Sequence, residues 1–127
     1  MEEKEHIHYD QFAKNSGIKL VEAKNGEAIA KMEIRNMHLN GLNLVHGGAL
    51  FTLADFTLGA AVNSLGGAHV TMSASIHYVK SAKEGTLIGI SKQVSAGRTI
   101  ATYDVEIRLE ATNDLIAVVR GNSFKKS

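Results

Sequence analysis

The segment 40–65, NGLNLVHGGALFTLADFTLGAAVNSL, constrains the fold most, because it passes from a polar, glycine-bearing loop into the most apolar run of the chain. Its apolar residues would cover every direction around a helix rather than one stripe, which predicts a helix buried on nearly all sides. At ~1.5 Å per residue this helix would be about 25 Å long, enough to cross a small domain. The sequence therefore predicts one long central helix.

Asp55 is the carboxylate in the middle of this apolar run. An unpaired buried carboxylate is costly, and Asp is rarely buried without a partner or a function. One interpretation is a structural Asp that is capped or linked to water, and the other is a catalytic carboxylate. The residues around Asp55 favour the catalytic interpretation.

Two other interpretations of the segment are weaker. Its length approaches the ~18–20 residues of a membrane-spanning helix, but Thr52, Asp55 and Asn63 interrupt it, so we expect no membrane span. Gly47 and Gly48 could form a phosphate-binding loop, but no glycine-rich loop ending in Lys and Ser or Thr is present.

Composition bounds the class of protein. A chain of 127 residues predicts one domain, 1–127, with little core to spare. A net charge of +1 gives no broad electrostatic basis for binding nucleic acid or a membrane surface. The lack of cysteine excludes a disulfide framework, a thiol nucleophile and a thiolate metal site. The charged start, MEEKEHIHYD, lacks the apolar core of a signal peptide, so we expect a cytoplasmic protein.

Shorter elements are predicted on both sides of the central segment. A helix is predicted over 7–15, with Ile7, Tyr9 and Phe12 on one face. Asn25-Gly26 is a hairpin signal between the first two of the predicted strands, which are 18–23, 27–34, 69–80, 86–95, 99–110 and 115–124. Five or six antiparallel strands must curl around the long helix, because both need an apolar partner.

Three motif positions carry a resemblance to a known family. Asn40 precedes His46 by six residues, His46 opens a His-Gly-Gly motif, and Asp55 follows His46 by nine residues. This pattern resembles the hotdog-fold acyl-CoA thioesterases, and the nearest branch looks like the phenylacetate-degradation type. The resemblance covers roughly the whole chain, including residues 95–99 and 120–121.

The resemblance implies an α+β hotdog fold, in which a curved antiparallel sheet of five to six strands wraps the long helix. It also implies a homodimer whose sheet continues across both subunits, and often a homotetramer built from two dimers. The implied activity is hydrolysis of an acyl-CoA thioester without a metal or other cofactor.

Roles for individual residues follow from the same resemblance. Asp55 matches the catalytic carboxylate, and Gly47 matches the glycine whose backbone N–H polarises the thioester carbonyl. Asn40 matches a side-chain partner of that carbonyl. Thr71 falls where a Ser or Thr often positions the attacking water, and His46 matches the motif histidine.

Substrate contacts are expected at further positions. Arg98, and less directly Lys80 and Lys83, lie where the family often meets the CoA phosphates. Gly48 is at the predicted helix N-terminus, where the first N–H groups have no intrahelical partner. Phe56 is expected to line the acyl pocket.

Several of these assignments have alternatives that the sequence leaves open. Gly47 could be needed for packing against a strand, Asn40 could form a turn, and Thr71 could be an ordinary strand residue. His46 could hold its loop by donating to the backbone instead of acting as a base. Asp55 could activate water, or it could attack the carbonyl and form an anhydride.

The spacing of the motif gives an inference of its own. Gly47 and Asp55 are eight residues apart, which is about 12 Å along a helix. One carbonyl carbon cannot lie within ~3 Å of both groups. Two antiparallel copies of the helix would bring Gly47 of one beside Asp55 of the other, so the site should lie at a two-fold dimer interface.

Other functions compete with thioester hydrolysis. A non-catalytic acyl-CoA-binding module is the main alternative, and a hotdog-fold hydratase is a weaker one because its matched Asp and His pair is not found. No metal site is predicted: His6 and His8 have no third ligand nearby and are interpreted as a solvated end, and His69 and His77 form no convincing set.

Overall fold

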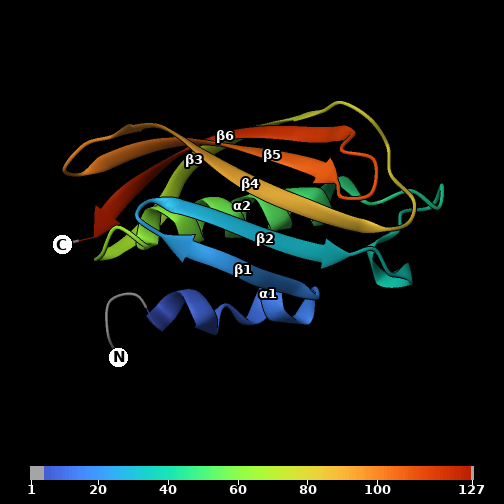
Figure 1. Cartoon of the computed structure of the whole chain (residues 1–127), viewed down its shortest axis with the longest axis horizontal. Coiled ribbons are helices and arrows are strands. Elements are labelled where there is room, and N and C mark those ends of the chain that lie inside the picture. The colour runs from blue at the N-terminus through green and yellow to red at the C-terminus, as the bar shows by residue number, and fades with distance from the viewer. Residues whose placement is uncertain (1–4, 127) are drawn as a thin grey trace.

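The computed structural model describes residues 5–126, and its central feature is one long helix, α2, lying against a six-stranded antiparallel sheet (Figure 1). The sheet order is β1-β2-β4-β5-β6-β3. This is the predicted α+β architecture. Its elements are η1 (Glu5–Tyr9), α1 (Gln11–Asn15), β1 (Ile18–Lys24), β2 (Glu27–Glu33), η2 (Asn36–His38), α2 (Gly47–Asn63), β3 (Ala68–Tyr78), β4 (Thr86–Ala96), β5 (Ile100–Leu109) and β6 (Leu115–Lys126), where η is a 3₁₀ helix.

Helix α2 begins where its own sequence supplies a cap. The N-cap residue is His46, whose Nδ1 accepts a hydrogen bond from the Gly48 N–H at 2.8 Å. This bond satisfies one of the N–H groups that the start of a helix leaves unpaired. At the other end, the backbone N–H of Ser64 bonds to carbonyls of the last turn. Both ends of α2 are therefore fixed by local contacts.

Two glycines of the sheet allow α2 to pack closely against it. A Cβ built at Gly89 would lie 2.6 Å from Thr57 Oγ1, and one built at Gly121 would lie 2.7 Å from Leu58 Cδ1. Both distances are too short for a real side chain, so only glycine permits this approach. Leu53 and Ala54 on the same side of α2 are fully buried.

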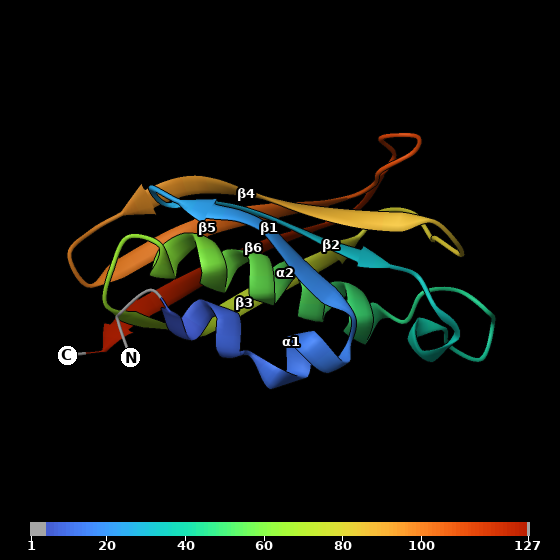
Figure 2. The same ribbon diagram turned by 60° about the horizontal axis from the view of Figure 1, so that its bottom comes forward.

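The opposite side of α2 is more open than the sequence suggested. Asp55, Phe56 and Gly59 are only partly buried. The prediction of burial on nearly all sides is therefore wrong for a single chain. The sheet covers one side of the helix, whereas the short segment η1–α1 covers only part of the other (Figure 2).

The N-terminal segment also differs from its prediction. Instead of one helix over 7–15, it forms η1 and α1, because Asp10 caps α1 by accepting a hydrogen bond from the Ala13 N–H at 2.9 Å. The break changes which residues face inward. Ile7 is buried as expected, but Tyr9 and Phe12 are 57% and 70% exposed, so the predicted apolar face is wrong for these two residues.

Strand β3 forms one edge of the sheet and is exposed along nearly all of its 11 residues. Val70, Met72 and Tyr78 are all about half exposed. A long edge strand presents unpaired backbone groups that can pair with another chain, and soluble proteins usually protect such an edge. In a single chain β3 has no such protection along its outer side within residues 5–126.

The outer face of the sheet carries ion pairs. β5 alternates as predicted, with Tyr103, Val105 and Ile107 buried beneath the sheet and charged residues between them. Glu106 accepts a hydrogen bond from Lys92 at 2.6 Å and another from Arg108 at 3.0 Å. The hydrogen bond from Lys92 is the largest cause that lowers the pKa of the Glu106 carboxyl. The Arg108 bond lowers this pKa less, and burial acts in the opposite direction.

This lowered pKa predicts a pH-dependent contribution to stability. A carboxylate whose pKa is lower in the folded state stabilises the fold above its unfolded pKa of about 4.3, and the gain is lost as the pH falls through the folded pKa. Glu106→Gln should therefore lower the free energy of unfolding by about 0.5–1 kcal/mol at pH 7. The difference from wild type should shrink as the pH falls below about 4, as measured by urea unfolding.

Glu33→Gln is the matched control, because Glu33 pairs with Arg35 in a more exposed setting. It should change the unfolding free energy less than Glu106→Gln does. A Glu106 effect that is unchanged from pH 7 to pH 3 would contradict an ionic origin.

None of the helices in residues 5–126 combines the length and apolar character that a membrane crossing requires.

Candidate active site

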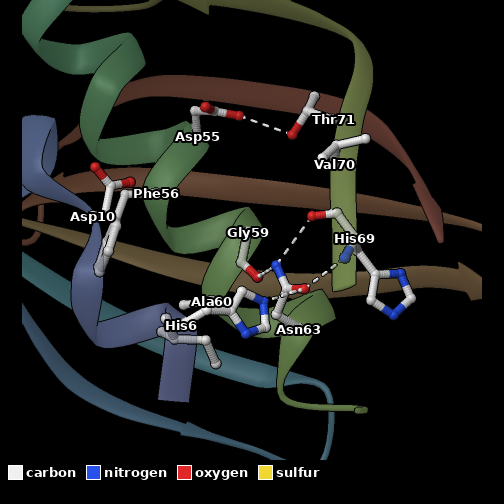
Figure 3. Close-up of a pocket in the computed structure, with 11 residues that line it drawn as sticks. His6, Asp10, Asp55, Phe56, Gly59, Ala60, Asn63, His69, Val70 and Thr71 are labelled. Carbon is white, nitrogen blue, oxygen red and sulfur yellow. Dashed lines mark hydrogen bonds between the residues drawn. The ribbon is translucent and has the colours of Figure 1, made fainter. Parts of the chain in front are cut away.

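Among the pockets that α2 residues line, two contain the predicted catalytic residues, and the described residues that line these two do not overlap. The Asp55 pocket, of about 340 Å³, lies between α2, η1 and the start of β3 (Figure 3), and its lining includes His6, Asp55, Phe56, Gly59, Asn63 and Thr71. The Gly47 pocket, of about 490 Å³, lies at the start of α2, and its lining includes Asn40, His46, Gly47, Gly48, Tyr78 and Lys80. The predicted catalytic residues thus divide into two groups.

Asp55 and Thr71 form the first group. Thr71 Oγ1 donates a hydrogen bond to Asp55 Oδ1 at 3.0 Å, which joins the middle of α2 to β3. The structure therefore brings these two predicted residues together. Asp55 is not deeply buried in a single chain, so the expected cost of burying its charge does not arise there. Its carboxylate faces the pocket, where a substrate could reach it (Figure 3).

Gly47 is the first residue of the second group. Among residues 5–126, no hydrogen-bond acceptor lies against its N–H, as expected for the first residue of a helix. The N–H of Gly48, in contrast, is already bonded to His46 Nδ1. The two glycines of the motif are therefore not equivalent, and Gly47 is the one with a donor available to a ligand.

Asn40 both forms a turn and lines the Gly47 pocket. Its Oδ1 accepts hydrogen bonds from the N–H groups of Leu42 and Leu44 at 2.9 and 3.2 Å, which hold the loop before α2. Its Nδ2 has no partner among the described residues, so this amide can still donate to a ligand in the pocket. The turn interpretation and the site interpretation of Asn40 are thus compatible.

His46 holds the loop by a different bond from the one expected. Its ring accepts from the backbone rather than donating to it, because Nδ1 caps α2. His46 is exposed at the rim of the Gly47 pocket. The cap gives this histidine a structural role.

Tyr78 was not predicted as a site residue. A Cβ built at Gly47 would lie 2.8 Å from the Tyr78 Oη, so the tyrosine ring rests directly on the glycine. A larger residue at position 47 would have to displace the Tyr78 ring, and Gly47 is also positioned as a donor. In the sequence, Tyr78 is only the last apolar residue of a strand pattern, and nothing local indicates its contact with the motif.

The predicted cations lie in different places. Lys80 lines the Gly47 pocket, and its Nζ donates to Asp114 Oδ2 at 3.0 Å. This bond is the main cause that lowers the pKa of the Asp114 carboxyl. Lys83 is exposed and lines neither of the two pockets. Arg98 lies in the exposed turn between β4 and β5, also outside both pockets, so its contact with CoA stays a prediction.

A polar network that the sequence did not reveal closes one end of the Asp55 pocket. The hub is Asn63, whose Oδ1 accepts hydrogen bonds from His6 Nε2 at 3.0 Å and from the His69 N–H at 2.7 Å. Its Nδ2 donates to the Gly59 carbonyl at 2.8 Å. His6 therefore anchors η1 to α2, and the prediction of a solvated end is wrong for this residue. Among the described residues, no group of three or more His, Asp or Glu is placed to hold a metal ion.

An antiparallel sheet wrapped around one long helix defines the class of hotdog-fold proteins. More particularly, the chain belongs to the thioesterase superfamily, whose family model matches residues 42–116. It is a thioester hydrolase of the phenylacetate-degradation-type branch.

Similar proteins place the chain in this branch. A putative esterase from Archaeoglobus fulgidus is 38% identical over 108 residues, which are 84% of this chain and 70% of that protein. The acyl-coenzyme A thioesterase PaaI from Escherichia coli is 32% identical over 117 residues, which are 91% of this chain and 83% of that protein.

Solved structures agree with the sequence comparison. The structure of E. coli PaaI, from the phenylacetic acid degradation operon, matches with a TM-score of 0.89 and 31% identity over 96% of this chain and 90% of that chain. A hypothetical thioesterase with coenzyme A from Streptococcus pneumoniae matches with a TM-score of 0.87 and 28% identity, over 96% of this chain and 95% of that chain. The predicted family and hotdog fold are thereby confirmed.

Proposed function

We propose that the protein hydrolyses acyl-CoA thioesters to a free acid and CoA, at sites shared by the two subunits of a homodimer. In each site, the Gly47 N–H and the Asn40 amide come from one subunit, and Asp55 with Thr71 comes from the other. The substrate class is supported by the relatives, since PaaI of E. coli is an acyl-coenzyme A thioesterase and the S. pneumoniae protein was solved with coenzyme A.

One observation carries the shared site: the donor and the carboxylate open into different pockets of one chain. Gly47 and Asp55 lie about 12 Å apart along α2, so they cannot both contact one thioester carbonyl. A two-fold axis between antiparallel copies of α2 would place the Gly47 pocket of one subunit against the Asp55 pocket of the other.

The exposed edge of the sheet supports the same dimer. Pairing β3 with its two-fold copy continues the sheet across both subunits and covers the unpaired edge. The half-exposed apolar residues Val70, Met72 and Tyr78 would then lie at or near the interface. A homotetramer of two such dimers, which the family resemblance implies, stays a further prediction.

The residues then divide the chemistry between them. The Gly47 N–H and the Asn40 Nδ2 hydrogen-bond to the carbonyl oxygen and stabilise the negative charge that develops on it. Asp55 either takes a proton from the water that attacks the carbonyl carbon, or attacks that carbon itself to give an anhydride that water hydrolyses. In both routes the C–S bond breaks and CoA leaves as the thiolate, while Thr71 orients the Asp55 carboxylate.

The direct test is release of the free CoA thiol from a panel of acyl-CoAs. Hydrolysis of at least part of the panel is expected. Tight binding of acyl-CoA without any thiol release would instead favour a non-catalytic acyl-CoA-binding module.

We also expect hydrolysis to need no metal, because the proposed donor, base and positioning groups are all supplied by the chain. Treatment with a chelator followed by removal of metal and chelator should leave kcat/KM within about twofold of its starting value, since no Lewis acid is assigned a role. Activity that disappears with the chelator and returns on adding zinc would contradict this prediction.

A further inference from the structure

The floor of the Asp55 pocket is formed in part by Gly59, a glycine in the interior of α2. Asp55, Gly59 and Asn63 follow one another at intervals of four residues, so they lie along one face of the helix (Figure 3). Glycine is unfavourable inside a helix, because it loses more backbone freedom on folding than any other residue. Its presence one turn after Asp55 therefore requires a physical reason.

Packing within one chain does not provide that reason. A Cβ built at Gly59 has no described atom within 4 Å, whereas one built at Gly89 or Gly121 would collide with α2 side chains. The backbone of Gly59 is helical and does not have the positive φ that favours glycine. Because glycine has no side chain, Gly59 leaves open space in the pocket that Asp55 also lines.

The lining of this space indicates which end of an acyl-CoA it accepts. Its acidic side chains are Asp10 and Asp55, its histidines are His6 and His69, and no Lys or Arg is among the described residues that line it. Carboxylates repel the CoA phosphates, so the nucleotide end is disfavoured there. Apolar side chains also line the space, at Ile7, Phe56, Ala60 and Val70, and Asn63 and Thr71 add neutral polar groups. The volume of about 340 Å³ leaves room for an acyl group.

The far wall of the space is fixed. The η1 segment carries the lining residues His6 and Ile7, and the His6 bond to Asn63 holds it against the end of α2. Ile7 is buried, which anchors the same segment from the core side. The pocket therefore has a defined depth, and the distance available above Gly59 limits what can enter.

We propose that Gly59 is a specificity-determining residue: the space above it receives the acyl group beside the reacting carbonyl and limits its size. The inference rests on the proposed function, because it assigns the acyl end of the substrate to the pocket that holds Asp55. Gly59 would act on the choice of substrate without contacting the thioester or the attacking water.

Gly59→Ala tests this inference through two readouts that should move in opposite directions. Thermal stability should rise, by about 3 °C in Tm, because alanine favours the helix and has room for its methyl group. The kcat/KM for acetyl-CoA should stay within about threefold, while kcat/KM for hexanoyl-CoA and phenylacetyl-CoA should fall at least ~10-fold. Gly59→Ser, of similar size, should show the same selective loss.

Thr52→Ala is the matched control, because it also favours the helix but lies on α2 outside the Asp55 pocket. Its ratio of hexanoyl to acetyl activity should equal that of wild type. If Gly59→Ala and Gly59→Ser also keep the wild-type ratio, the inference is wrong although the proposed function stands. A wild-type protein that hydrolyses none of the three substrates would overturn the proposed function and this inference together.

Discussion

Asp55→Asn should lower kcat for acyl-CoA hydrolysis at least ~100-fold while leaving substrate binding largely intact. Asparagine keeps the shape of the side chain but removes the charge, so it cannot serve as base or nucleophile, and general base catalysis alone contributes about that factor. Its amide oxygen can still accept the hydrogen bond that Thr71 Oγ1 donates to Asp55. The loss should therefore appear in kcat, measured by thiol release, and not in the dissociation constant of a non-hydrolysable acyl-CoA analogue.

The pocket offers a control of the same chemistry. Asp10→Asn removes the other carboxylate that lines the Asp55 pocket, and asparagine is an equally good N-cap for α1. It should change kcat by no more than about threefold, since no catalytic step is assigned to it. Near-wild-type hydrolysis by Asp55→Asn would reject a catalytic carboxylate and favour a structural one.

Local signals were sufficient for much of the fold. The hairpin predicted at Asn25-Gly26 joins β1 to β2, and both residues have positive φ, as a tight two-residue turn requires. The alternation in 99–110 also matches β5, with Tyr103, Val105 and Ile107 buried. These features succeed because turn geometry and strand periodicity are properties of neighbouring residues.

One error arose from a local helix cap, and the others arose from contacts far away in the sequence. The apolar face predicted for 7–15 failed at Phe12, because the Asp10 cap divides the segment into two short helices. His6 was interpreted as solvated because its partner, Asn63, is 57 residues away. The open face of α2 likewise depends on what covers it, and a helical pattern alone does not specify that partner.

The candidate site likewise has some features that the sequence predicted and others that it did not. The spacing of Gly47 and Asp55 predicted that one chain would keep the donor and the carboxylate apart, and they do open into separate pockets. The family resemblance, rather than any local pattern, pointed to Thr71, which the structure places 3.0 Å from Asp55. Tyr78 and Asn63 gave no local signal, since their contacts with Gly47 and His6 arise only when β3 and η1 pack against α2.

Two inactive variants should restore activity when their subunits are mixed, if the site is shared. Asn40→Asp keeps an oxygen that can accept from the Leu42 and Leu44 N–H groups, so the loop is preserved, but it removes the donor and places charge near the oxyanion. Asp55→Asn removes the base. Each homodimer should be nearly inactive, because both of its sites lack the same group.

A mixed dimer has a different composition at its two sites. One site combines both defects, whereas the other takes Asn40 from the Asp55→Asn subunit and Asp55 from the Asn40→Asp subunit, so it is intact. Random reassortment makes about half of the dimers mixed, each with one good site of two, so about a quarter of wild-type activity should return after co-refolding. Subunit exchange is checked separately by pull-down through a tag on one variant.

The mixing experiment distinguishes an active site shared between two subunits from an active site built within one subunit. If each active site were built within one subunit, every site in the mixture would carry one of the two defects, and mixing would restore nothing. Absence of recovery despite demonstrated exchange would therefore place Asn40 and Asp55 in a site of one chain. That result would require a substrate to bridge the about 12 Å between Gly47 and Asp55, which one thioester carbonyl cannot do. Recovery near a quarter would instead assign the two pockets of each chain to two different active sites.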